Sequence, residues 1–183
     1  MTFFPWDEIN ALESKAETAQ TRYQNGDKDA VGSFIDEVTE LFEMDYMLGV
    51  QDASMQIGRS IDPDYRQLAD ALTTKIDGKD YTERITDYIK GGTPYDIARV
   101  IATDAHRIYN TAMYDGAKKG GATRKTWRTM LDDRVRDTHE YLQSVTVDID
   151  APFYTWNGNN AMYPGQFGIA EEDCGCRCWV TFS

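Results

Sequence analysis

All three cysteines of this chain, Cys174, Cys176 and Cys178, lie within five residues near its C-terminal end. The two members of a Cys-x-Cys pair are poorly placed to bridge one another, because disulfide geometry restricts both the Cα separation and the dihedral angle about the sulfurs. The odd number also leaves one thiol over. The sequence therefore leaves three states open: reduced thiols, a bridge to another chain, and thiolates bound to a soft tetrahedral ion such as zinc.

Three sulfur ligands around zinc need a fourth ligand. The chain has two histidines, and one of them, His139, lies in a polar stretch of the same C-terminal third. A closed structural zinc site would then use His139, Cys174, Cys176 and Cys178. Alternate residues of an extended strand point to one side, so the three sulfurs could share a face. The competing interpretation is that the cysteines are reduced thiols that pack as small apolar groups.

The sequence predicts no enzyme. It contains no Gly-x-Ser-x-Gly, no phosphate-binding Gly-rich loop and no His-Glu-x2-His. A metal-dependent hydrolase is the alternative, and it would need an open metal position with Asp133 or Glu172 as general base. Thiolate ligands disfavour this chemistry because they donate charge to the metal and weaken it as a Lewis acid. We therefore expect no catalytic residue and no small-molecule substrate, and zinc only in a structural role.

The chain is acidic, with a net charge of −12 and a pI of about 4.5. This charge opposes non-specific binding to phosphate backbones and to anionic lipid. DNA or partner contact is expected only where positive side chains gather, and one such cluster exists: Lys118, Lys119, Arg124, Lys125 and Arg128. Three further arginines, Arg134, Arg136 and Arg177, have acidic neighbours and are expected to form ion pairs that link a helix to the last strand.

Hydrophobic periodicity predicts helices in the first part of the chain and a mixed structure after it. Apolar side chains recur at helical spacing in five segments, at 9–23, 31–50, 63–76, 81–89 and 94–119. Two helix starts carry capping signals, Asp62-Pro63 and Thr93-Pro94. After Gly120-Gly121, strand-like runs at 145–149 and 179–182 flank a helix expected at 132–142. The fold class is therefore α+β, with a helical region at 1–120 and a small α+β domain at 121–183 that a metal would stabilise.

The composition indicates a folded, soluble protein. Aromatic residues make up 12% of the 183 residues, which argues against disorder. The first residues, Met1 to Glu8, show no basic stretch followed by an apolar run, and no later segment is long and apolar enough to span a membrane. We expect synthesis in the cytoplasm, where clustered cysteines favour metal or redox chemistry over a disulfide framework.

The order and spacing of several short blocks resemble the phage minor head proteins of the Mu F-like, head-morphogenesis family. The blocks are Lys125-Thr126-Trp127, Asp132 to His139, Ala151-Pro152-Phe153, Tyr163-Pro164 and Glu171 to Trp179. The resemblance begins in the preceding helix, which holds Arg99, Thr103 and His106. It covers the C-terminal part of the chain, whereas the N-terminal helices match the family only in type.

The resemblance implies a minor capsid protein that sits in the capsid interior or at the portal vertex of a tailed phage, and in the host cytoplasm before assembly. Such a protein would act in head assembly, genome packaging or DNA delivery. Its implied partners are the portal protein, the major capsid protein and the packaged phage DNA. Related domains also occur fused to bacterial toxins, but no effector module fits in this chain. The hydrolase alternative would then act in head maturation or as a toxin-associated module.

Overall fold

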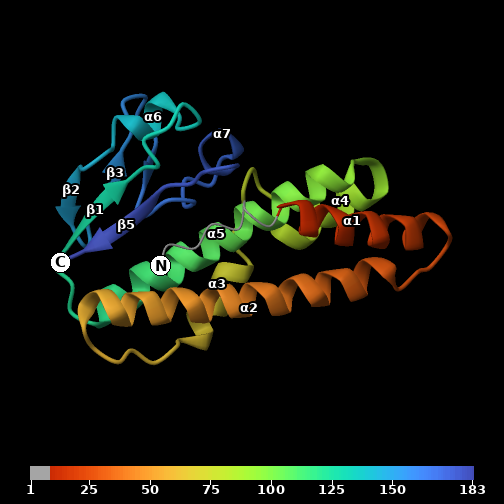
Figure 1. Ribbon diagram of the computed structural model, residues 1–183, viewed down its shortest axis with the longest axis horizontal. Coiled ribbons are helices and arrows are strands. Elements are labelled where there is room, and N and C mark those ends of the chain that lie inside the picture. Colours follow the sequence, from red (N-terminus) through yellow and green to blue (C-terminus); the bar gives the residue numbers. More distant parts are fainter. Residues whose placement is uncertain (1–8) are drawn as a thin grey trace.

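The computed structural model describes residues 9–183, and its N-terminal part is helical (Figure 1). The helices are α1 (Ile9–Gln24), α2 (Ala30–Ile57), α3 (Tyr65–Leu72), α4 (Tyr81–Gly91) and α5 (Pro94–Lys119). These five helices confirm the segments predicted from periodicity. Residues 1–8, in which the sequence shows no leader pattern, lie outside the described part.

Side-chain caps explain where three of these helices begin. Thr93 and Asp96 form a capping box at the start of α5, with Pro94 in the first turn, as predicted. Asp80 and Glu83 form a second capping box at the start of α4. The prediction for α3 was wrong by two residues, because the carboxylate of Asp64, rather than that of Asp62, accepts the backbone N–H of Arg66.

Helix α5 forms the centre of the molecule. It packs against α2 along much of its length, and α1 and α4 cover its N-terminal half (Figure 1). Nearly every residue from Ile97 to Ala117 is buried. The approach to α2 depends on Gly49, because a Cβ there would lie 2.5 Å from the carbonyl oxygen of Tyr109.

The C-terminal part adds a small sheet at one end of α5, which confirms the α+β class (Figure 1). Its three antiparallel strands are β1 (Arg124–Arg128), β2 (Thr146–Asp148) and β5 (Trp179–Phe182), in the order β2-β1-β5. A second, two-stranded pair is formed by β3 (Phe153–Tyr154) and β4 (Asn160–Ala161). Two short helices complete this part, α6 (Asp137–Glu140) and α7 (Ala170–Asp173).

Two local features of this region differ from what the sequence led us to expect. The helix expected at 132–142 is reduced to α6, because Leu131 adopts φ +56° and the Asp132 carboxylate accepts the N–H of Arg134 in a turn. The central strand β1 was not predicted, since its basic composition suggested a surface cluster. The signal for a strand was that Lys125 and Trp127 are two positions apart, because alternate residues of a strand face the same side. Both side chains are buried.

Buried side chains form two main clusters that share α5. The first fills the space between the helices around Phe42, Ile85 and Ile101. The second surrounds Trp127 in the C-terminal part and includes Tyr114 of α5. A boundary near residue 120 stays a prediction, because α5 supplies side chains to both clusters.

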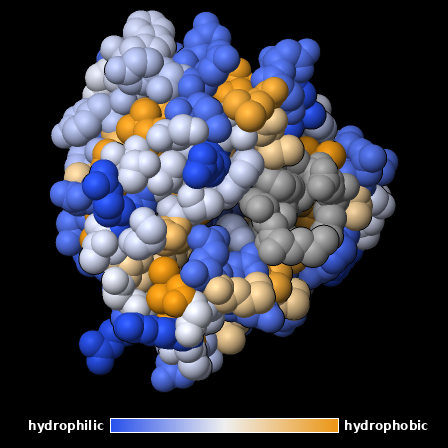
Figure 2. Space-filling model, turned by 60° about the vertical axis from the view of Figure 1, so that its left-hand side comes forward, coloured by the Kyte–Doolittle hydropathy of each residue, from blue (hydrophilic) through white to orange (hydrophobic). Residues whose placement is uncertain are grey.

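The surface is largely hydrophilic on the face shown in Figure 2, where hydrophobic side chains gather only in small separate patches. This agrees with the strongly acidic composition. None of the helices among the described residues is long and apolar enough to cross a membrane.

Candidate metal centre

The structure brings His139, Cys176 and Cys178 together at the centre of the C-terminal part. His139 lies on α6, and the two cysteines lie between α7 and β5. Nδ1 of His139 is 3.6 Å from Sγ of Cys176 and 3.5 Å from Sγ of Cys178. The three ligand atoms lie within 4.8 Å of one another, and the residues are only 1–2% exposed. Two of the three predicted sulfurs therefore converge on the predicted histidine.

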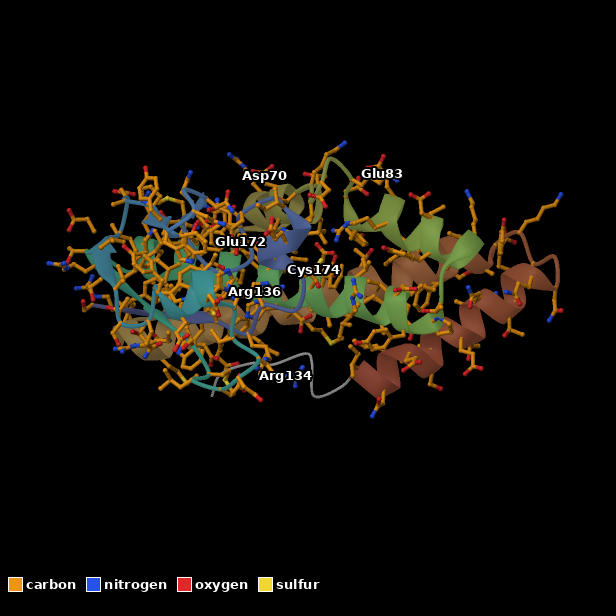
Figure 3. The ribbon with its side chains drawn as sticks, turned by 90° about the horizontal axis from the view of Figure 1, so that it is seen from above. Asp70, Glu83, Arg134, Arg136, Glu172 and Cys174 are labelled. Atoms are coloured by element: carbon orange, nitrogen blue, oxygen red, sulfur yellow. The ribbon has the colours of Figure 1, made fainter. Side chains whose placement is uncertain are left out.

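Cys174 does not join this group, which corrects the four-residue site expected from the sequence. The chain is not extended here: Gly175 adopts φ +70°, and the N–H of Cys176 bonds to the carbonyl oxygen of Asp173. The turn directs Cys174 toward a groove of about 470 Å³ that Arg84 and Arg99 also line. Figure 3 labels Cys174 and, on α7, Glu172. Burial raises the pKa of its thiol.

Glu172 supports the other side of the His139 ring. Its Oε2 lies 3.2 Å from Nε2 of His139, although the ring N–H does not point straight at it. The carboxylate accepts hydrogen bonds from Thr138 at 2.8 Å and from Asn159 at 2.9 Å. Burial alone would raise the pKa of Glu172, but these hydrogen bonds lower it below its usual value. A charged carboxylate therefore faces the imidazole at neutral pH.

Aromatic rings enclose the imidazole. Phe167 stacks on His139 with the ring centroids 5.4 Å apart, and Trp127 meets it edge-on at 5.5 Å. Nε1 of Trp127 is buried and has no hydrogen-bond partner among the described residues. The rings keep the group away from solvent, and Phe167 is a site residue that no sequence motif indicated.

The thiol of Cys176 is protonated at neutral pH when no metal is bound. The adjacent Cys178 thiol, together with burial, raises the pKa of Cys176 well above its ordinary value. A metal ion would have to displace this proton, as thiolate ligands always require.

His106 contacts the same segment from α5. Its Nε2–H donates to the carbonyl oxygen of Cys178 at 2.8 Å. Burial lowers the pKa of His106 to about 4, so the ring is neutral at pH 7. It holds the backbone of Cys178 and is not a ligand. His106 is therefore a buried, hydrogen-bonded residue of α5.

The arginines near α6 and α7 form part of the expected network. Arg177 pairs with Asp132 at 2.5 Å. Arg136 donates to the carbonyl oxygen of Cys174, and both residues are labelled in Figure 3. These contacts link the segment before α6 to the segment after α7, on either side of His139.

The predicted basic cluster is divided in the structure. Three of its members already have partners: Lys118 with Asp150, Lys119 with Asp64 at 3.0 Å, and Arg128 with Ser144 at 3.2 Å. Arg124 is exposed. A single positive surface formed by all five residues is therefore not present.

Lys125 is fully buried, which corrects its assignment as a partner or DNA contact. Its Nζ lies 4.6 Å from the ring centroid of Tyr114 and 5.4 Å from that of Phe153. It has no ion pair among the described residues. Burial lowers its pKa to about 8.

Comparison with known proteins places this architecture in a phage family. The family model described as "Phage Mu protein F like protein" matches residues 65–181, from α3 to β5. This segment covers more than half of the chain and contains the whole candidate metal centre. The chain belongs to the Phage Mu protein F like family, as its sequence motifs indicated.

Two curated relatives are similar over part of their length. The NAD(+)--arginine ADP-ribosyltransferase EFV of Enterococcus faecalis is 36% identical over 114 residues, which are 58% of this chain and 23% of that protein. The minor head protein GP7 of Bacillus phage SPP1 is 33% identical over 89 residues, which are 46% of this chain and 29% of that protein. The matches thus span less than a third of either relative. No solved structure matches significantly.

Proposed function

We propose that this protein is a minor structural component of a tailed-phage head, which acts by binding other head components. The family match over α3–β5 is the observation that carries this proposal. The similarity of this chain to a protein named as a minor head protein agrees with the proposal. The proposed location is the virion, at the portal vertex or in the capsid interior. The proposed role lies in head assembly, genome packaging or DNA delivery.

We further propose that the protein has no enzymatic activity of its own. Similarity to a protein named as an ADP-ribosyltransferase covers less than a quarter of that relative, so it is no reason to assign that activity to this chain. A metal-dependent hydrolase is disfavoured because His139, Cys176 and Cys178 are 1–2% exposed, and a substrate would have to reach the metal.

An exposed apolar groove on the helical part suits a partner. Its volume is about 900 Å³, and it is lined by Met44, Met47, Leu48 and Tyr65 with Glu40 and Glu43 at its side. Met44 is 58% exposed and Tyr65 is 69% exposed. We assign this groove to an amphipathic segment of the portal protein with basic flanking residues, because the acidic side chains and the net charge of −12 would attract it.

Binding to the portal protein of the same phage tests this assignment. The double variant Met44→Gln, Met47→Gln should weaken binding at least tenfold, or about 1.4 kcal/mol. Met55→Gln is the matched control, because Met55 is also exposed on α2 but does not line the groove. Calorimetry should show full binding for the control. Equal affinity of both variants would place the contact elsewhere.

Two further measurements test the head role itself. Purified virions should contain the protein in few copies, and heads made without it should be defective in assembly, packaging or delivery. Incubation with NAD+ and an arginine-containing acceptor should give no ADP-ribosylated product. A labelled acceptor, or virions that lack the protein and are fully infectious, would refute the proposal.

A further inference from the structure

We propose that His139, Cys176 and Cys178 bind one zinc ion, and that Cys174 takes no part. The ligand atoms are Nδ1 of the imidazole and the two Sγ atoms. This site is independent of the role in the phage head, since a protein of any function could carry it.

The distances fit a tetrahedral zinc ion. With Zn–S of about 2.3 Å and Zn–N of about 2.0 Å, a nitrogen and a sulfur ligand lie about 3.5 Å apart. Nδ1 of His139 lies 3.6 Å from one sulfur and 3.5 Å from the other. Both nitrogen–sulfur distances therefore match those of a tetrahedral zinc site, and the three ligand atoms lie within 4.8 Å of one another.

Hydrogen bonding alone explains the arrangement less well. Nδ1 of a neutral imidazole has a single lone pair, so it can accept a hydrogen from one thiol only. Yet the two sulfurs lie at almost equal distances from it. A metal ion would engage all three atoms at once, and the spacing of Cys176 and Cys178 disfavours a disulfide between them.

Glu172 acts as the positioning residue for His139. Its carboxylate faces Nε2 and favours the tautomer with the hydrogen on that nitrogen, which leaves the lone pair of Nδ1 free to face the sulfurs. Thr138 and Asn159 hold the carboxylate by hydrogen bonds. Metal-ligating histidines commonly have such an acidic partner on the second ring nitrogen.

The charge balance suits a buried site. Each thiol releases one proton to the buffer on binding, so the zinc dication, two thiolates and a neutral imidazole sum to zero. The negative charge of Glu172 is stabilised separately, by its hydrogen bonds from Thr138 and Asn159. No fourth His, Cys, Asp or Glu belongs to this group among residues 9–183, and we assign the remaining position to a water molecule. Because the three ligand residues are only 1–2% exposed, a substrate does not reach this water, and the site stays structural. The indole N–H of Trp127 has no hydrogen-bond partner among the described residues, and its ring contacts His139 edge-on. It is therefore a free donor among the aromatic rings that surround the imidazole.

Cobalt titration of the full chain tests the site. Metal-free protein, prepared with a chelator under reducing conditions, should bind one Co²⁺ per chain with a thiolate-to-cobalt charge-transfer band and strong visible bands of tetrahedral cobalt. One equivalent of Zn²⁺ should abolish these bands. Cys176→Ser, Cys178→Ser and His139→Asn should each lose them.

Cys174→Ser is the matched control, because it changes a cysteine in the same short segment and should leave the cobalt spectrum intact. Glu172→Gln should keep the spectrum while weakening the affinity about 10–100-fold. In case the ligand variants do not fold, alkylation of the wild-type chain supplies a second readout. Zinc should protect Cys176 and Cys178 from a maleimide, while Cys174 reacts.

Three results would overturn the proposal. One is a wild-type chain without the charge-transfer band at one equivalent of cobalt. Another is loss of the band in Cys174→Ser. The third is reaction of all three cysteines with maleimide at equal rates in the presence of zinc. None of them bears on the virion assay, so failure of the zinc site and failure of the head role are distinguishable.

Discussion

At the scale of single residues, burial changes the chemistry of Lys125 more than that of any other cation in the predicted basic cluster. Its ammonium group sits among aromatic rings and makes no ion pair within the described residues. Its pKa is therefore lowered to about 8, from 10.5. Between these two pH values the unfolded chain binds more protons than the folded chain, so this lysine makes the free energy of unfolding rise with pH.

Lys125→Met should remove the contribution of this lysine to the rise of the free energy of unfolding with pH. Urea unfolding at pH 7.5 and 10 should show a smaller gain in the free energy of unfolding for the variant than for the wild type. Lys118→Met serves as the control, because Lys118 is exposed and its bond to Asp150 raises its pKa above the ordinary value. The contribution of Lys118 to the pH dependence of the free energy of unfolding therefore lies above the pH range in which Lys125 titrates. Identical pH dependence of Lys125→Met and the wild type would contradict the lowered pKa.

At the scale of elements, the close crossing of α2 and α5 determines how the bundle packs. Gly49 allows the two backbones to approach, because a methyl group there would meet the carbonyl oxygen of Tyr109 at 2.5 Å and the Cβ of Ala112 at 2.7 Å. A Cβ at Gly32, on the same helix, would meet nothing within 4 Å. The two glycines therefore differ in packing but share a helical backbone.

Opposite effects are expected from Gly49→Ala and Gly32→Ala. The first should lower the free energy of unfolding by about 1–3 kcal/mol, because the helices must separate. The second should raise it by about 0.5–1 kcal/mol through better helix propensity. Urea denaturation followed by circular dichroism measures both. Equal free energies of unfolding for the two variants would show that the backbones of α2 and α5 do not approach closely at Gly49.

At the scale of the whole molecule, α5 couples the helical part to the C-terminal part. It contributes Ile101 and Ile108 to one cluster and Tyr114 and Ala117 to the other. Neither cluster is complete without it. The two parts should therefore unfold together, even though the sequence suggests a boundary near residue 120.

Hydrogen exchange under native conditions measures this coupling. The amides of Phe42 in α2 and of Trp127 in β1 should open with the same free energy and respond equally to urea. A fragment of residues 121–183 should fail to fold, since it lacks the α5 side chains of its own core. Independent opening of the Trp127 region, or a folded fragment, would show two autonomous domains.

Local sequence determined the helices and the family. Helix starts such as Thr93-Pro94 are visible in the sequence because their caps join residues three positions apart. The order of the motif blocks around His139 and Cys176 was enough to indicate the Mu F-like family. These signals act over short distances along the chain, so they need no knowledge of the fold.

Only the tertiary structure decided which residues make the site. Cys174 is separated from Cys176 by the turn at Gly175, and Lys125 is buried because β1 pairs with β2 and β5. The contacts of Cys176 and Glu172 with α6 join residues more than 30 positions apart. Contacts across such separations depend on how distant segments pack, and no local pattern in the sequence encodes them.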